Sequence, residues 1–465
     1  MRPPANHNEP PVSRCIPASR RDFLKASTLA AGTAAFGGLS LARSAHAAGD
    51  DTIRIALVGC GGRGTGAAAQ ALSTKGPIKL VAMADVFPQR LKNSHEQLKK
   101  EFADKVAVPK DCRFLGFDGY RQAMACLRPG DIVLLTTPPA FRWVHFGHAI
   151  EKGINTFMEK PTAVDGPTSR KMFALAQAAE KKNLKVGVGL MTRHCPVRLQ
   201  LIERIRQGQL GEILMMRTYR MHGPVAFFAS DPKPQGISDL LYQVQRFHSF
   251  IWASGGAYSD FYIHNIDECC WMKGAWPVEA QALGGRHYRG QSIDQNFDTY
   301  SVEYTFADGT KLLMFGRCMP GCYDQFDSWI HGTKAVASTS GPGMYPARGF
   351  LYKGQTPEKS ALLWKSSLRE RGPYQLEWDH LVDAVRNNKP YNEAQRGAQA
   401  SLVTSMGRMA AHTGRVVTYD QILNTDYELA PHVDRLTMDS PAPLLPGPDG
   451  KYPVPQPGIV TSREY

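Results

Sequence analysis

The residues with the clearest potential for chemistry form a glycine-rich stretch near the start of the chain. Residues 59–64 spell GCGGRG and fit the pattern G-x-G-x-x-G. They follow a β-branched apolar run, residues 52–58, and precede an Ala-rich run that favours a helix. Such glycines allow a tight turn and let a helix N-terminus approach a pyrophosphate. The predicted cofactor-binding residues of this turn are Gly59, Gly61, Gly62, Arg63 and Gly64.

Asp85 stands 21 residues after Gly64, at the end of a second apolar run, residues 78–84. A carboxylate in that place accepts hydrogen bonds from the adenosine ribose hydroxyls and repels a 2′-phosphate. The spacing therefore favours NAD over NADP as the cofactor. The alternative interpretation is a purely structural glycine turn.

Glu159-Lys160-Pro161 follows another buried run, residues 155–158. Ligands of parallel sheets bind beyond the carboxyl ends of the strands. Apolar surroundings and a cationic nicotinamide lower the pKa of a lysine, so Lys160 could share a proton with a substrate hydroxyl. The alternative is an ordinary surface lysine before a proline.

Residues 255–267 (GGAYSDFYIHNID) contain a third set of candidate residues. If the chain is helical from Tyr258, then Asp260, His264 and Asp267 lie at i, i+4 and i+7 on one face. A carboxylate one turn from a histidine can fix its tautomer and raise its basicity, which suits a general base. The alternative is an ion pair on the surface of a helix whose other side is buried.

The elements that must position these residues change character along the chain. Strands alternate with helices until about residue 191, which predicts a doubly wound parallel sheet. Later runs alternate polar and apolar residues, and Asp308-Gly309 joins two of them as a hairpin signal. We expect an α/β protein with a Rossmann domain followed by an α+β domain whose sheet is open and mainly antiparallel. The predicted parts are a signal peptide (1–47), a Rossmann domain (48–191), a substrate and oligomerisation domain (192–430) and a Pro-rich tail (431–465) that wraps the surface or is disordered.

The first 47 residues have the order of an export signal. Arg20-Arg21 precedes a weakly apolar run, residues 26–41, and Ala45-His46-Ala47 offers small residues for cleavage after Ala47. The arginine pair indicates the twin-arginine route, with the twin-arginine translocase as a partner and the periplasm as the destination. The alternative is a membrane anchor, but the run is shorter than the ~20 apolar residues that span a bilayer. We therefore expect no stable membrane insertion.

Charge and cysteine usage exclude other classes of function. The chain has 55 Lys and Arg against 42 Asp and Glu, but no basic run interleaved with aromatic residues. Scattered surface charge is therefore favoured over a nucleic-acid partner. Of the nine cysteines, Cys269 and Cys270 are adjacent, and Cys318 and Cys322 lack a second matching pair. This spacing predicts no metal site and leaves disulfide pairing open.

Together these motifs resemble the family of glucose–fructose oxidoreductase, inositol dehydrogenase and rhizopine-catabolism proteins, often written Gfo/Idh/MocA. The resemblance covers about residues 52–431 and includes the glycine pattern, Thr137-Pro138, Glu159-Lys160-Pro161 and the helix with Asp260 and His264. It implies further cofactor contacts at Thr137, Pro138, Glu159 and Lys160. It also implies that Lys160, Asp260 and His264 surround the reacting carbinol beside the nicotinamide.

Two positions depart from the family pattern. Arg142 stands near the place where many members have a histidine, and Tyr262 replaces a common glycine. Both departures concern the identity of the substrate. The predicted substrate-binding residues are Arg193, His194, Tyr262 and Asp267.

The resemblance implies hydride transfer between a sugar or polyol hydroxyl carbon and a tightly held NAD. His264 would take the hydroxyl proton, Lys160 would polarise the oxygen, and Asp260 would orient the histidine or a substrate hydroxyl. Export of a folded protein would carry the cofactor with it, so each cycle must restore it. The alternatives are a redox-neutral NAD-dependent glycosidase or lyase with a transient keto-sugar, and a non-catalytic sugar-binding protein. The resemblance also implies a homo-oligomer.

Overall fold

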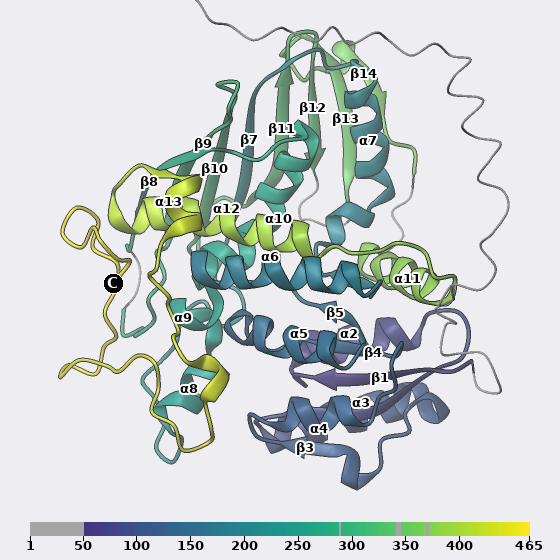
Figure 1. Cartoon of the computed structure of the whole chain (residues 1–465). Coiled ribbons are helices and arrows are strands. Elements are labelled where there is room, and N and C mark those ends of the chain that lie inside the picture. Colours follow the sequence, from purple (N-terminus) through teal and green to yellow (C-terminus); the bar gives the residue numbers. More distant parts are fainter. Residues whose placement is uncertain (1–50, 288–289, 341–345, 369–371) are drawn as a thin grey trace, which may run out of the picture. The chain divides into compact units, whose positions relative to one another are not determined.

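The computed structural model describes residues 51–287, 290–340, 346–368 and 372–465 (Figure 1). The predicted signal peptide and its cleavage site lie outside these ranges. No helix within them is long and apolar enough to cross a membrane.

The N-terminal sheet has six parallel strands in the order β3-β2-β1-β4-β5-β6. Their bounds are β1 Ile53–Val58, β2 Ile78–Asp85, β3 Arg113–Leu115, β4 Ile132–Leu135, β5 Asn155–Met158 and β6 Val186–Val188. The central strands are buried on both faces, which explains their continuous apolar sequences. The strand order reverses direction between β1 and β4, where dinucleotides bind in sheets of this topology. The predicted Rossmann fold is confirmed.

Helices cover both faces of this sheet. They are α2 Gly62–Leu72, α3 Pro88–Phe102, α4 Gly119–Ala125, α5 Arg142–Glu151 and α6 Gly166–Lys181. A late helix, α11 (Pro373–Arg386), returns to the same domain and buries Trp378 and Leu381 against residues of β1 and β5. The core of the first domain therefore includes side chains from far along the chain.

The second sheet has nine strands in the order β14-β13-β12-β11-β7-β10-β9-β8-β15, antiparallel except for the β10–β7 pair. Their bounds are β7 Ile213–His222, β8 Glu279–Gly285, β9 Thr299–Thr305, β10 Lys311–Cys318, β11 Gln325–Gly332, β12 Ala335–Ser340, β13 Arg348–Lys353, β14 Leu362–Lys365 and β15 Val417–Thr418. The turn at Asp308-Gly309 joins β9 to β10, as expected, and Gly309 has a φ of +83°. The predicted, mainly antiparallel sheet is confirmed.

The remaining helices are α7 Pro196–Arg206, α8 Asp239–Gln245, α9 Ile251–Ser254, α10 Gly256–Lys273, α12 Ala394–Thr413 and α13 Tyr419–Asn424. Helices α10 and α12 pack against one face of the second sheet, and α12 also contacts α6 (Figure 1). Buried side chains of α10 and α12 thus link the two sheets.

Residues 431–465 follow the surface with little regular structure, but parts of them are buried. Val433 and Tyr452 belong to an apolar cluster with Phe250 and Trp252. Glu464 is 1% exposed. Of the two predicted states of the tail, the structure shows the one that wraps the surface.

Candidate active site

The glycine turn lies directly after β1 and leads into α2. Gly59 has a φ of +98°, and Gly61 is the N-cap of α2. A Cβ added to Gly64 would lie 2.0 Å from the carbonyl oxygen of Gly59, whereas one added to Gly61 or Gly62 would meet no atom within 4 Å. Gly64 therefore lets the helix approach the strand, and the space before the helix N-terminus remains open to a ligand.

Arg63 points across the turn rather than along it. Its Nε donates a hydrogen bond to Glu159 over 2.5 Å, and its guanidinium lies 4.8 Å from the ring centre of Tyr374. Its Nη2 lies 3.6 Å from Oε1 of the buried Glu377. Arg63 and Glu159, both predicted to bind the cofactor, thus join the glycine turn to the Glu159-Lys160-Pro161 turn.

A cavity of about 540 Å³ opens at the carboxyl ends of β1, β2 and β4. This volume is typical of cofactor and small-molecule sites, which measure ~300–1,000 Å³. The cavity is lined by the glycine turn, Asp85, Arg90, Thr137, Pro138, His145, Ala226, Phe227, Phe247 and His248, among others. Residues of both domains therefore form its wall.

Asp85 ends β2 at one side of this cavity. Its carboxylate accepts hydrogen bonds from the backbone N–H of Cys60 over 2.6 Å and of Phe87 over 2.9 Å. Burial raises the pKa of Asp85, while these N–H groups and Arg90 act in the opposite direction. Arg90 was not predicted. It lies over the ring of Phe87 and adds a positive charge to the part of the cavity that Asp85 borders.

Arg142 forms a hydrogen bond with the backbone of the Thr137-Pro138 turn. The Arg142 side chain is buried, and its Nη2 donates a hydrogen bond to the carbonyl oxygen of Thr137 over 2.8 Å. The guanidinium of Arg142 thus bonds to backbone carbonyls, and Arg142 is not part of the cavity lining. His145 lines the cavity instead, 3.2 Å from Oγ1 of Thr137, and burial lowers its pKa to about 3.

Lys160 and Asp260 meet between the two domains. Nζ of Lys160 donates to the carbonyl oxygen of Asp260 over 2.7 Å and lies 3.4 Å from its Oδ1. Oδ2 of Asp260 lies 3.0 Å from Nε2 of His248. Burial alone would raise the pKa of the Asp260 carboxyl, but Lys160 and His248 lower it well below its usual value. Asp260 is therefore a carboxylate shared between an ammonium and an imidazole.

The structure brings His248, rather than His264, into contact with the carboxylate of Asp260. The interpretation that Asp260 fixes the tautomer of His264 is wrong, because the carboxylate bonds to Lys160 and His248. Nδ1 of His264 is buried with no hydrogen-bond partner among the described residues. Burial and the nearby Lys160 lower the pKa of His264 well below its usual value.

No local pattern marked His248 as a site residue. It lies in a short 3-10 turn, Phe247–Ser249, twelve residues before Asp260. The chain reverses at Gly255, which has a φ of +76°, and helix α10 then packs against this turn. Phe227, Phe247 and Phe261 surround its ring. His248 belongs both to the cavity wall and to the cluster around Asp260.

The predicted substrate-binding residues do not converge on the cavity. Arg193 forms two hydrogen bonds with the fully buried Asp267, over 2.7 and 2.8 Å, so each satisfies the other. His194 contacts His380 through their Nδ1 atoms, 2.8 Å apart. Tyr262 is buried against β10, where its ring fills the space above Gly316. The helical period placed Asp267 on one face with Asp260 and His264, but it does not reveal what each residue of that face contacts.

Within the described ranges, no group of three or more His, Cys, Asp or Glu side chains is placed so that it could hold a metal ion. The cysteines of the described ranges form no disulfide with one another. Cys112 and Cys126 are neighbours in space, with their Sγ atoms 3.7 Å apart.

The cavity at the glycine turn agrees with a comparison against known families. Residues 53–190 match the family GFO_IDH_MocA, described as an oxidoreductase family with an NAD-binding Rossmann fold. The N-terminal domain is therefore similar to the NAD-binding domain of that family. Relatives with curated names extend the similarity beyond this domain.

Three such relatives align with different shares of their length. The chain is 24% identical over 228 residues to the rhizopine catabolism protein MocA of Rhizobium meliloti, covering 48% of this chain and 63% of MocA. It is 27% identical over 272 residues to the myo-inositol dehydrogenase Hyg17 of Streptomyces leeuwenhoekii, covering 58% and 71%. It is 26% identical over 278 residues to glycosyl hydrolase family 109 protein 1 of Bacteroides thetaiotaomicron, covering 57% and 55%.

A likeness to solved structures extends over both domains. The aldose-aldose oxidoreductase of Caulobacter crescentus, solved with glycerol, superposes with a TM-score of 0.60. The superposition covers 79% of this chain and 99% of that chain at 17% sequence identity. This likeness shows that the two proteins share a fold.

Proposed function

We propose that this protein is an NAD-dependent oxidoreductase that transfers a hydride between a hydroxyl-bearing carbon of a sugar or polyol and a tightly held cofactor. The observation that carries the proposal is the meeting of Lys160, Asp260 and His248 at the domain boundary, with His248 in the wall of the glycine-turn cavity. The name of the Streptomyces relative supports a polyol substrate.

The residues of the cavity fit a nicotinamide dinucleotide. The open space before Gly61 and Gly62 accepts a pyrophosphate, which the N-terminus of α2 stabilises. Asp85 would bind the adenosine ribose, and its carboxylate favours NAD over NADP. The bound nicotinamide would supply a hydride acceptor or donor.

The protein side chains would handle the proton. The ammonium of Lys160, held by Asp260, would donate a hydrogen bond to the substrate oxygen and stabilise negative charge on it. Burial keeps the imidazole of His264 neutral, so it is free to accept the hydroxyl proton. His248 would orient Asp260 and close the cavity beside the substrate.

Two steps test this proposal. The purified protein is denatured and the released dinucleotide identified, and then the reduction of bound cofactor is followed with a panel of aldoses and inositols. Lys160→Met and Asp260→Asn should slow the reduction by roughly 10²–10⁴-fold while the cofactor stays bound. Lys152→Met, at the end of α5, is the matched control and should react normally. Normal rates in both site variants would contradict the proposal.

A redox-neutral glycosidase is the second candidate, favoured by the similarity to the family 109 glycosyl hydrolase. Transient oxidation of a sugar hydroxyl acidifies a neighbouring C–H and permits loss of the glycosidic group, after which the hydride returns. Release of a chromogenic aglycone without an added redox partner would support this candidate. A strict requirement for a second redox substrate would contradict it.

We also propose twin-arginine export to the periplasm with the cofactor already bound. The support is the sequence of residues 19–47, with Arg20-Arg21 before a weakly apolar run. Replacing Arg20 and Arg21 by lysine should retain the protein in the cytoplasm, whereas a normal periplasmic level would contradict export by this route.

A homo-oligomer is proposed from the open face of the second sheet. Tyr219 and Phe315 stack on that face with ring centres 5.2 Å apart, and both remain partly exposed, as does Trp329. Sedimentation of Phe315→Asp beside the unmodified protein tests this assignment, since equal masses would contradict it.

A further inference from the structure

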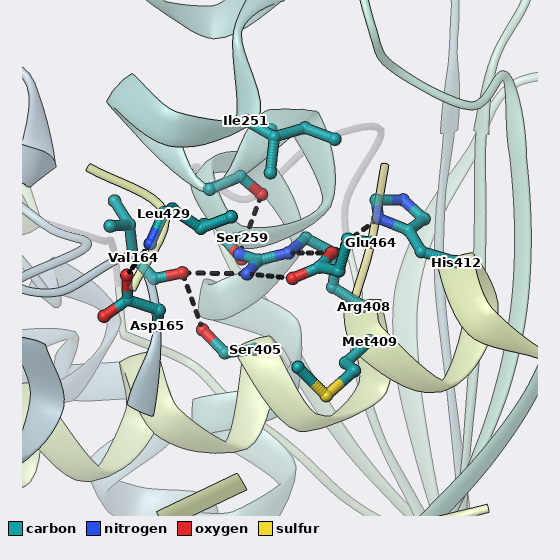
Figure 2. A network of polar contacts seen from close by, with 12 residues as sticks. Val164, Asp165, Ile251, Ser259, Ser405, Arg408, Met409, His412, Leu429 and Glu464 are labelled. Atoms are coloured by element: carbon teal, nitrogen blue, oxygen red, sulfur yellow. Dashed lines mark hydrogen bonds and ion pairs between the residues drawn. The ribbon is translucent and has the colours of Figure 1, made fainter. Parts of the chain in front are cut away.

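Arg408 of α12 is a buried charge whose hydrogen-bonding capacity is fully used. Arg408 is only 1% exposed to solvent. Nη1 donates to the carbonyl oxygen of Gly255 over 3.0 Å and to Oγ of Ser259 over 2.8 Å. Nη2 donates to the carbonyl oxygen of Val164 and to Oε1 of Glu464, and Nε donates to Oε2 of Glu464, each over 2.8 Å. All five guanidinium N–H groups therefore have acceptors (Figure 2).

Three of the acceptors, on Val164, Gly255 and Ser259, lie on the two segments that carry the proposed catalytic pair. Val164 is four residues after Lys160, in the turn that follows β5. Gly255 and Ser259 flank the start of α10, and Ser259 directly precedes Asp260. Arg408 thus joins the backbone of one segment to the backbone and side chain of the other.

The same helix holds the first segment at a second point. Oγ of Ser401 accepts a hydrogen bond from the backbone N–H of Thr162 over 3.0 Å. Oγ of Ser405 donates to the carbonyl oxygen of Val164 over 3.3 Å. A Cβ on Gly255 would lie 2.7 Å from Nη1 of Arg408, so the close approach requires glycine there.

Glu464 makes this burial of charge possible. Its residue is 1% exposed, and its Oε2 also lies 2.6 Å from Nδ1 of His412. Burial alone would raise the pKa of Glu464, but Arg408 and His412 lower it to about 2. The carboxylate stays ionised at neutral pH and forms a planar two-point pair with the guanidinium. Lysine has no equivalent fork, so it could not reach the same acceptors.

We infer that Arg408, neutralised by Glu464 from the Pro-rich segment, is a positioning residue that sets the separation of Lys160 and Asp260. The inference rests on the proposed function, because it assigns Arg408 an effect on the chemical step. Neither Arg408 nor Glu464 lines the glycine-turn cavity. Their action passes through the backbone at Val164 and Gly255.

The test compares two ways of disturbing a buried ion pair. Glu464→Gln leaves the shape of the side chain but removes its charge. Glu268→Gln is the matched control, since Glu268 pairs with Arg198 over 2.7 Å and lies on α10, eight residues beyond Asp260. Both variants should lose thermal stability. Glu464→Gln alone should lower kcat, by about 10–100-fold, with little change in KM or in bound NAD.

The pH profile gives a readout that lost stability does not move. If Lys160 and Asp260 move apart, the carboxyl of Asp260 loses a cation that lowers its pKa. The acid limb of the kcat profile should then shift to higher pH in Glu464→Gln. Should Glu464→Gln fail to fold, the double variant Arg408→Met/Glu464→Leu removes both charges together, and apolar replacement of a buried pair is often tolerated.

The outcomes separate this inference from the proposed function. If Lys160→Met abolishes reduction of the cofactor but Glu464→Gln and the double variant keep the kcat and pH profile of Glu268→Gln, the positioning role is wrong. If Lys160→Met reacts normally, the proposed function itself is wrong. Loss of kcat with an unchanged KM in the Glu464 variant supports the inference.

Discussion

Replacing Gly64 with alanine would place a methyl carbon 2.0 Å from the carbonyl oxygen of Gly59 and 2.6 Å from Oγ1 of Thr136. Ordinary carbon–oxygen contacts are about 3.3 Å or longer. Helix α2 would have to retreat from β1 by on the order of 1 Å, and it would disturb the 2.6 Å hydrogen bond from Thr136 to Gly59. The backbone of the turn leaves no flexible side chain to absorb this shift.

Overpacking of this kind costs about 1–3 kcal/mol, and contact with backbone puts Gly64→Ala near the upper value. In a domain of this size the expected fall in Tm is about 6–12 °C. Gly61→Ala should behave in the opposite manner. Its φ of −71° suits alanine and its Cβ has open space, so stability should stay within ~0.5 kcal/mol of the unmodified protein.

Cofactor affinity should separate the two variants again. The methyl group of Gly61→Ala would occupy the approach of a pyrophosphate to the N-terminus of α2. Losing a hydrogen bond to a charged group costs about 1.5–3 kcal/mol, which corresponds to roughly 10–100-fold weaker NAD binding.

The assays are calorimetric unfolding of the cofactor-free protein and titration with NAD, because bound ligand would raise Tm by itself. Gly66→Ala is the internal control. It lies in the same helix with only an ordinary contact to Arg63, so it should keep or slightly raise Tm. A normal Tm for Gly64→Ala would refute the close helix–strand approach. Normal NAD affinity for Gly61→Ala would refute the phosphate-binding role of the turn.

Three further predictions concern charge and redox state. Asp85→Ser should weaken NAD binding and strengthen NADP binding, because it removes the carboxylate that repels a 2′-phosphate; an unchanged ratio of the two dissociation constants would argue against that role. Glu464, with its pKa lowered to about 2, should contribute roughly 3 kcal/mol of stability above about pH 4.5, and this should be lost as the pH falls towards 2. Acid unfolding of Glu464→Gln should lack this component, and identical pH curves would contradict it. A disulfide oxidant should join Cys112 to Cys126, whose Sγ atoms are 3.7 Å apart, but slowly, because burial and the neighbouring thiol raise the pKa of Cys126 to about 11. Counting thiols before and after oxidation checks this, and no loss of two thiols would count against it.

Much of the first domain follows from local patterns. The glycine turn follows β1, Asp85 ends β2, and Glu159-Lys160-Pro161 follows β5. Parallel strands place all their carboxyl ends at one edge of the sheet, so residues that follow different strands must come together there. Apolar runs and turn residues carry that information within a few positions.

The contacts of α10 could not be predicted in the same way. Its period places Asp260 and His264 on one face, but Asp260 bonds to Lys160 and His248, which other elements supply. Likewise, Asp267 is satisfied by Arg193. The helix is buried over almost its whole length, so each face meets a different neighbour. The helical period alone therefore cannot predict which residues those neighbours are.

The sequence alone determined a Rossmann sheet, a second sheet with a hairpin at Asp308-Gly309, and a glycine turn between β1 and α2 at Gly59–Gly64. Only the tertiary structure decided that His248 is the histidine beside Asp260 and that Glu464 lies against Arg408, 56 residues away in the chain. The physical reason is that turns and strands depend on the conformational preferences of adjacent residues. A buried charge instead requires whichever partner the fold brings within hydrogen-bonding distance, however distant in sequence.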